Sequence, residues 1–286
     1  MSYQSKLTPP EHSESNILVS FPLEHVLLIT LNRKVTMNAM TPGLAADIAR
    51  VMDWFETETS LWAVIITGAG RAFCAGMDLV AWQKDQSAGN NTNISQAEVS
   101  VAEGNNGIGG ISQRRSKKPI IAAVNGFAIG GGLEIVLNCD IVVSSKDAKF
   151  GFPEASRGVT VSSGGIPRLM KNSGHQLAAE LLLTGRLISA TEAQDRFRFV
   201  NAVVPPKDVL PTALQWAKTI IASSPDAVQS NKRGILSSLE LGGVEEARLS
   251  HVKSPETEAL FKGENVLEGL KAFTEKRKPK WGNPKL

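Results

Sequence analysis

Long apolar runs and cysteine are scarce in this sequence of 286 residues, and its histidines are scattered. No segment approaches the roughly 18 consecutive apolar residues of a membrane span, so none is expected. The only cysteines, Cys74 and Cys139, lie in apolar surroundings and are interpreted as small buried residues of a protein from a reducing compartment. The four histidines lack the spacing of metal ligands, and no metal site is predicted.

Several motifs of common enzyme classes are missing too. The sequence contains no Gly-Lys-Ser/Thr phosphate loop and no Gly-x-Ser-x-Gly nucleophile turn. Gly68-Ala69-Gly70 follows a predicted strand, but a dinucleotide-binding turn needs a third glycine where Phe73 stands. These absences argue against nucleotide-dependent and serine-hydrolase chemistry.

Charge is nearly balanced, with a net value of +3. Only two compact basic clusters occur, at residues 114–118 and 276–280. Such clusters are usually solvated surface, and contact with a phosphate-bearing small ligand is the second interpretation. Because no long basic stripe is present, nucleic acid is not an expected partner.

Residues 1–16 are polar, contain two prolines and are expected to form a mobile arm rather than a signal or transit peptide. At the other end, Pro284-Lys285-Leu286 resembles the Ser-Lys-Leu peroxisomal address, with proline in the first position. We therefore expect a peroxisomal or cytoplasmic location.

Between the ends, strand-like apolar runs alternate with helical periodicity. Residues 17–31 predict a hairpin, and three further runs predict buried strands at residues 62–68, 120–124 and 141–143. Thr41-Pro42 is a typical start for a helix that continues to Thr57. This alternation predicts an α/β protein built from right-handed β–β–α units on a mostly parallel framework.

The strand signal stops near Pro205-Pro206, and helical periodicity follows at residues 210–224, 227–241 and 264–276. We divide the chain into the arm (1–16), a β–β–α core (17–205) and a helical region (206–286). The polar stretch between Leu79 and Pro119 is expected to be a long loop, either functional or disordered.

Two glutamates lie at glycine-containing turns. Glu134 ends the run Gly130-Gly131-Gly132-Leu133-Glu134, and Glu154 ends Phe150-Gly151-Phe152-Pro153-Glu154; a third small-residue turn is Ala75-Gly76-Met77-Asp78-Leu79. Glycine lets backbone N–H groups approach a ligand, and a helix that begins there adds partial positive charge. Two such turns facing one point would form an oxyanion hole with carboxylates beside it for proton transfer. Alternatively, each glutamate is a solvated acid in a helix first turn.

Together with Leu31-Asn32-Arg33, Met37-Asn38-Ala39 and Pro119–Gly126, these segments resemble the enoyl-CoA hydratase/isomerase (crotonase) superfamily, in its order, from about Val19 to Lys278. The resemblance implies a spiral of β–β–α units, a helical C-terminal region that assembles trimers or hexamers, an acyl-CoA thioester substrate and no separate cofactor.

The same resemblance implies that the N–H groups of Met77 and Gly131 form the oxyanion hole. It also implies that Glu134 orients the water molecule and that Glu154 exchanges the proton. Because both glutamates are present, reversible hydration of a 2-enoyl-CoA is favoured. A double-bond isomerase with Glu154 as its one base is an alternative, and a non-catalytic or RNA-binding member of the fold is a further one.

Further residues are assigned to substrate and CoA only by the resemblance. They are Thr36, Asn38, Ala39, Ala75, Gly76, Asp78, Leu79, Gly130 and Pro153, with Phe273 and Lys276 reaching CoA from a neighbouring subunit. Val35 and Val80 stand where lysines are common, so phosphate contacts are expected from Arg33, Lys34 or Lys276.

One departure concerns the acyl pocket. The family pattern Gly-x-x-Pro-Gly-x-Gly-Gly corresponds to residues 158–165, where Ser162 replaces a glycine beside the reacting carbons. We expect its hydroxyl to narrow the pocket and to meet a polar group of a short or branched acyl chain. The alternative is a bond to its own loop.

Overall fold

The computed structural model describes residues 5–80, 83 and 106–285. Its main sheet has the strand order β1-β2-β3-β5-β7-β10. These strands are β1 (Ile17–Leu23), β2 (Val26–Leu31), β3 (Ala63–Gly68), β5 (Ile120–Val124), β7 (Ile141–Ser145) and β10 (Ala202–Val204). The β1–β2 pair is antiparallel, as the predicted hairpin requires, and the remaining neighbours are parallel.

A smaller sheet has the order β4-β6-β8-β9. Its strands are β4 (Ala72–Cys74), β6 (Phe127–Ile129), β8 (Lys149–Gly151) and β9 (Leu187–Ser189). Each of β3, β5 and β7 in the large sheet is followed by a strand of the small one, and β5-β6 leads directly into α4 (Gly131–Asn138). This is the predicted β–β–α unit, and the small sheet brings the turns after β4, β6 and β8 to one edge.

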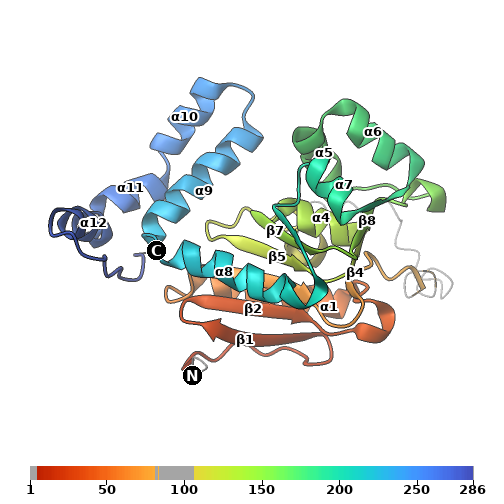
Figure 1. The fold of residues 1–286 in the computed structure, drawn as a ribbon, viewed down its shortest axis with the longest axis horizontal. Coiled ribbons are helices and arrows are strands. Elements are labelled where there is room, and N and C mark those ends of the chain that lie inside the picture. The colour runs from red at the N-terminus through yellow and green to blue at the C-terminus, as the bar shows by residue number, and fades with distance from the viewer. Residues whose placement is uncertain (1–4, 81–82, 84–105, 286) are drawn as a thin grey trace.

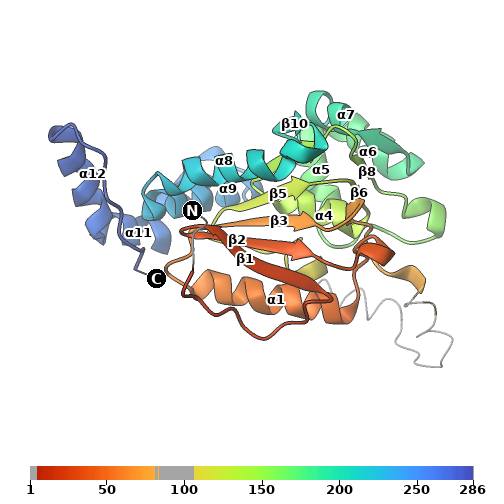
Figure 2. The same cartoon turned by 60° about the horizontal axis from the view of Figure 1, so that its bottom comes forward.

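Helices cover both faces of the main sheet, as Figure 2 shows with α1 (Pro42–Thr57) on one side and α8 (Val209–Ile221) on the other. The hydroxyl of Thr41 accepts the N–H of Leu44 at 3.3 Å, and Pro42 opens α1, as predicted. The other helices of the core are α5 (Gly165–Ser173), α6 (His175–Thr184) and α7 (Ala190–Asp195). Short 3-10 turns are η1 (Lys34–Thr36), η2 (Ile108–Gly110), η3 (Ala155–Arg157) and η4 (Pro206–Asp208).

The first helix beyond Pro206 corrects the expected role of the C-terminal region. Helix α8 buries Val209, Ala213 and Ala217 in one apolar cluster with Ile65 and Ile121 of the sheet. It therefore packs on its own chain rather than on a neighbour. Only the later helices project away from the core (Figure 1): α9 (Pro225–Glu240), α10 (Val244–Val252), α11 (Pro255–Lys262) and α12 (Glu264–Thr274).

The basic cluster at 114–118 is also reinterpreted, because Arg114 and Lys118 are buried. The ammonium group of Lys118 donates to the carbonyls of Phe55 and Glu58 at 2.6 and 2.8 Å, where α1 ends. Burial lowers the pKa of Lys118 to about 8. These contacts satisfy helix-end carbonyls and are not those of a phosphate site.

The N-terminal segment is held in place rather than mobile from Glu11 onwards. Buried Asp47 of α1 accepts the amide of Asn16 at 2.8 Å and the N–H of Ser13 at 3.2 Å. Arg50 donates to the carbonyl of Glu11 at 2.7 Å. The expected mobile arm is therefore anchored on α1 in its second half, because a buried carboxylate needs donors.

Most of the predicted loop between Leu79 and Pro119 lies outside the described residues. No helix in the described part is long and apolar enough to cross a bilayer.

Candidate active site

The site begins where β6 ends and α4 starts. Gly130 adopts a positive φ of 56°, and Gly131 is the first residue of α4. N–H groups in a helix first turn have no partner within the helix and lie at its positive end. Close packing requires glycine at position 132, because a Cβ there would lie 2.1 Å from the carbonyl oxygen of Cys74.

The turn that carries Met77 lies against this helix start. Met40 donates its N–H to the carbonyl of Gly76 at 2.7 Å and accepts the N–H of Asp78 at 3.0 Å. Both bonds flank Met77 on one side, so its own N–H points to the other side. Gly76 has a φ of 85°, and a Cβ on it would lie 3.1 Å from the nitrogen of Gly131. The structure thus brings together the two turns that were predicted to face one point.

Glu134 is not a solvated first-turn acid, since only 2% of it is exposed. Its Oε1 accepts the N–H groups of Ser163 and Gly165 at 2.8 and 2.9 Å. Burial raises the pKa of Glu134, and these two N–H groups and the charge of Arg168 oppose the increase. Because both donors bind Oε1, the carboxylate is held in one orientation, with Oε2 as the oxygen left for a ligand.

Glu154 lies beside Gly130. A Cβ on Gly130 would lie 2.4 Å from Oε1 of Glu154, and the positive φ of Gly130 further disfavours any other residue there. Oε2 of Glu154 is buried and has no hydrogen-bond partner within the described residues. Burial raises the pKa of Glu154 to about 7, and the negative charge of Glu134 adds to this increase. A partly buried carboxyl with one buried, unused oxygen is suited to exchange a proton near neutral pH.

Side-chain hydrogen bonds from Arg33 and Asn38 fix the expected CoA-binding segment at residues 36–39. The guanidinium of Arg33 donates to the carbonyl of Ala39 and pairs with Asp78 at 3.5 Å. The buried amide of Asn38 donates to the carbonyls of Ala69 and Ala72 at 3.1 and 2.8 Å. Arg33 and Asn38 therefore use these groups to shape the loop, which corrects the expectation of Arg33 as a phosphate contact.

The remaining expected contacts surround these turns. Thr36 and Leu79 are exposed, Ala75 and Pro153 are partly exposed, and the N–H of Ala75 donates to the carbonyl of Met37 at 3.1 Å. Phe273 and Lys276 are exposed and lie at the α12 end, away from β4, β8 and α4 (Figure 1). The structure does not bring this pair to the glutamates of the same chain.

The serine that contacts the carboxylate of Glu134 is Ser163 and not Ser162. Ser162 is exposed, whereas Ser163 is fully buried and binds Glu134 through its N–H. The hydroxyl of Ser163 has no partner in the described part of the chain. Sequence reasoning missed Ser163 and Gly165, although the Gly164-Gly165 pair before a helix was an available signal for N–H donors.

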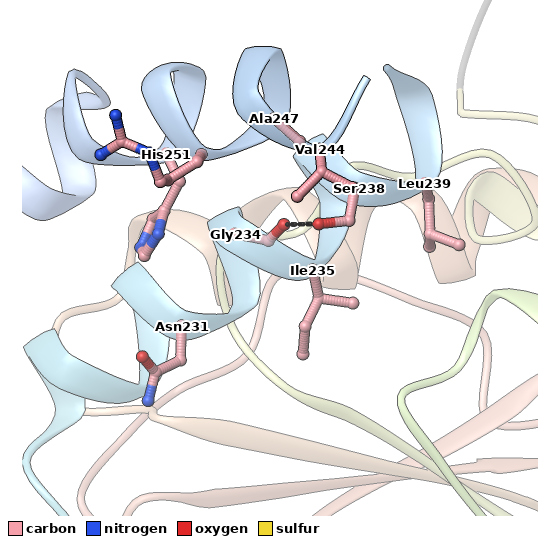
Figure 3. A pocket seen from close by; sticks show the side chains of 9 residues that line it. Asn231, Gly234, Ile235, Ser238, Leu239, Val244, Ala247 and His251 are labelled. Carbon is pink, nitrogen blue, oxygen red and sulfur yellow. Dashed lines mark hydrogen bonds between the residues drawn. The ribbon is translucent and has the colours of Figure 1, made fainter. Parts of the chain in front are cut away.

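A hollow of about 510 Å³ lies between α9 and α10, apart from the two glutamates (Figure 3). Apolar side chains such as Ile235, Leu239 and Val244 line it, and the hydroxyl of Ser238 donates to the carbonyl of Gly234 within α9. It has no pair of acids and is not the candidate active site. Across the described residues, no group of His, Cys, Asp and Glu side chains could hold a metal ion.

Comparison with known proteins now decides the family. Residues 23–284 match the model of the enoyl-CoA hydratase/isomerase family. The chain belongs to this family. A crystal structure of enoyl-CoA hydratase from Bacillus anthracis superposes with a TM-score of 0.82 at 31% identity, covering 93% of this chain and 98% of that one. The crotonase fold and the hydratase-like character predicted above are thereby confirmed.

Two curated members of the enoyl-CoA hydratase/isomerase family are more similar in sequence. The mevalonyl-coenzyme A hydratase of Aspergillus fumigatus is 44% identical over 94% of this chain and 96% of its own length. The enzyme of the same name from Beauveria bassiana is 40% identical over 97% of this chain and 98% of its own. The protein is an enoyl-CoA hydratase that acts on acyl-CoA thioesters.

Proposed function

We propose that this hydratase interconverts mevalonyl-CoA and the enoyl-CoA formed from it by loss of water, 5-hydroxy-3-methylpent-2-enoyl-CoA. Support comes from the two relatives named for mevalonyl-CoA, which match nearly the whole chain. The acyl group is short, branched and hydroxylated, which is the class expected from Ser162. Hydration adds the hydroxyl of water to the β-carbon and a proton to the α-carbon.

In the proposed mechanism, the N–H groups of Met77 and Gly131 polarise the thioester carbonyl and stabilise the enolate. Glu134, fixed through Oε1, orients water through Oε2. Glu154, whose pKa is about 7, gives its proton to the α-carbon, and the proton released by water returns to the carboxylate pair. The observation that carries this proposal is the carboxylate pair, with Glu134 buried and Glu154 partly buried, beside two adjoining backbone turns.

Substrate choice is tested with a matched pair of thioesters. We expect kcat/KM for 5-hydroxy-3-methylpent-2-enoyl-CoA to exceed that for 3-methylpent-2-enoyl-CoA by about tenfold or more, the effect of one hydrogen bond. The two differ only in the terminal hydroxyl. Crotonyl-CoA completes the panel, and a clear preference for it would contradict the proposal.

We further propose that the enzyme assembles as a trimer or a dimer of trimers, with Phe273 and Lys276 of one subunit near the CoA of another. Their exposure and their distance from the glutamates of their own chain support this arrangement (Figure 1). A shared site of this kind would make CoA binding depend on assembly.

Location is a separate proposal. We propose a peroxisomal enzyme, with the cytoplasm as the alternative, because Pro284-Lys285-Leu286 resembles a peroxisomal address. Pro284 is buried and Lys285 pairs with Glu264 at 3.0 Å, so this segment would have to detach from the protein before a receptor could bind it.

The location is tested with a fluorescent protein fused to the N-terminus of the chain. The fusion should mark peroxisomes, and its fluorescence should become diffuse on Lys285→Glu. Diffuse fluorescence from both proteins would favour the cytoplasm.

A further inference from the structure

Ser112 follows η2 and is fully buried. Its hydroxyl accepts the N–H of Ile108 at 2.9 Å and donates to the carbonyl of Ser163, also at 2.9 Å. Ser112 and Ser163 are far apart in the sequence, so one hydroxyl joins two distant segments. The hydroxyl of Ser112 thus uses its only O–H donor and one of its acceptor lone pairs.

Each partner of Ser112 leads to one half of the candidate site. Ile108 packs directly on Gly131, because a Cβ on Gly131 would lie 2.6 Å from Cδ1 of Ile108. Ser163 donates its N–H to Oε1 of Glu134 at 2.8 Å. The segment around η2 therefore touches the helix start that carries the proposed oxyanion donor and also holds the loop that orients the glutamate.

We propose that Ser112 is a positioning residue, whose hydroxyl fixes the Ser163 peptide against Glu134 and Ile108 against Gly131 at the same time. This inference rests on the proposed roles of Glu134 and Gly131.

Loss of this bond has a defined electrostatic consequence. A looser Ser163 peptide gives Glu134 a weaker donor, and the pKa of Glu134 then rises further because its charged form is less stabilised. The charged groups that act on Glu134 are Arg168 from α5 and Glu154 before η3. Among the elements packed on α4, β4 also carries the Cys74 thiol, whose pKa burial raises to about 11. No ionisable side chain belongs to η2 or β6. None of these groups changes in a Ser112 variant.

Ser116 provides a matched control in the same segment. It is 1% exposed, and its hydroxyl accepts the N–H of Lys118 at 3.1 Å and donates to the carbonyl of Lys118 at 2.7 Å. These bonds both go to Lys118, whereas those of Ser112 go to Ile108 and Ser163. Ser112→Ala and Ser116→Ala each remove a buried hydroxyl with one donor and one acceptor, so similar losses of melting temperature are expected.

The two variants should differ in catalysis. With the enoyl-CoA that the unaltered enzyme turns over fastest, Ser112→Ala should lower kcat about tenfold, leave KM nearly unchanged and move the acid limb of the pH profile to higher pH. Ser116→Ala should keep kcat and the profile. Amide hydrogen exchange at Ser163 and Gly165 should accelerate in Ser112→Ala alone.

If Ser112→Ala behaves like Ser116→Ala in kcat, pH profile and amide exchange, the inference is overturned. Should Ser112→Ala fail to fold, Ser112→Cys keeps a weak donor of similar size and should show the same changes to a smaller extent. Full activity of Glu134→Gln would instead overturn the proposed role of Glu134. The exchange measurement would still decide whether Ser112 holds the loop.

Discussion

At the scale of single residues, the two glutamates differ in what holds them. Glu134 is fixed by two backbone donors, whereas Oε2 of Glu154 has none among the described residues. In Glu134→Gln, the amide oxygen can still accept both N–H groups, so the orientation persists while the charge is lost. We expect kcat to fall by about 100-fold to 10,000-fold with CoA-ester binding nearly intact, measured as loss of enoyl absorbance.

The same assay separates the alternatives for this family. Glu154→Gln should reduce hydration to a similar degree, because it removes the group proposed to exchange a proton. If Glu134→Gln kept full activity while Glu154→Gln lost it, a double-bond isomerase with one base would be favoured over a two-glutamate hydratase. Deuterium incorporation from solvent then shows which carbon exchanges.

Glu154 also links stability to pH. Its pKa rises from 4.5 to about 7 in the folded chain, so the folded state binds the proton more tightly than the unfolded state. The free energy of unfolding therefore falls as pH rises between those two values and is level above pH 7. Glu154→Gln should melt a few degrees higher than the unaltered protein at pH 8, and the difference should vanish near pH 4. Equal melting temperatures throughout would contradict this.

Ser163 allows a prediction in the opposite direction from most buried substitutions. Its hydroxyl is buried without a partner, and such a group costs about 1–3 kcal/mol. Ser163→Ala removes that cost and keeps the N–H that binds Glu134, so the free energy of unfolding should rise by about 1 kcal/mol. Denaturant unfolding measures it, with Ser116→Ala as the destabilised control. A loss of activity without a gain in stability would show that the hydroxyl serves the substrate.

At the scale of elements, α4 is placed by close contact with β4. A Cβ on Gly132 would lie 2.1 Å from the carbonyl oxygen of Cys74, and backbone cannot yield as a flexible side chain can. Gly132→Ala should therefore displace the start of α4, destabilise the protein by about 1–3 kcal/mol and reduce kcat.

Gly242 is the matched control for this substitution. Nothing lies within 4 Å of a Cβ on Gly242, and its φ is not positive. Gly242→Ala should be close to neutral in denaturant unfolding. Equal effects of the two substitutions would mean that α4 is not positioned by this contact.

At the scale of the whole molecule, helices α9 to α12 project from the core (Figure 1). These helices carry exposed apolar side chains. Val244 at the α9–α10 hollow is 90% exposed, and Phe273 on α12 is 84% exposed. Large exposed apolar surface of this kind is typical of a protein interface. This arrangement is the physical basis of the proposed assembly.

Assembly and CoA binding can be tested together. Leu267 and Leu270 on α12 are 67% and 63% exposed, and replacing both with glutamate should shift the sedimentation of the enzyme towards a smaller species. Lys276→Ala should weaken CoA binding in an intact trimer, because a phosphate-contacting charge would be lost. An unaltered protein that sediments as an active monomer would refute the shared site.

Much of the site could be predicted because its signals are local. The glycines at 76 and 130 indicate turns, and both have a positive φ in the structure. Apolar runs indicate buried strands whatever the strands pack against. The identity of the serine beside Glu134 had no such signal. Ser162 and Ser163 are alike in chemistry, and only the path of the loop across α4 decides which one faces the carboxylate.

The sequence by itself determined the hairpin, the buried strands of the main sheet before β10, the first helix and the helical C-terminal region. It also supplied the three turns, the two glutamates and the resemblance that named the family. Only the tertiary structure decided that Lys118 binds the carbonyls at the end of α1 and that α8 packs on the sheet of its own chain. The same holds for the hydrogen bond by which Ser112 joins η2 to the loop carrying Ser163. The physical reason is separation along the chain. Propensity and periodicity act over a few neighbours, whereas these contacts join residues 51 and 63 positions apart.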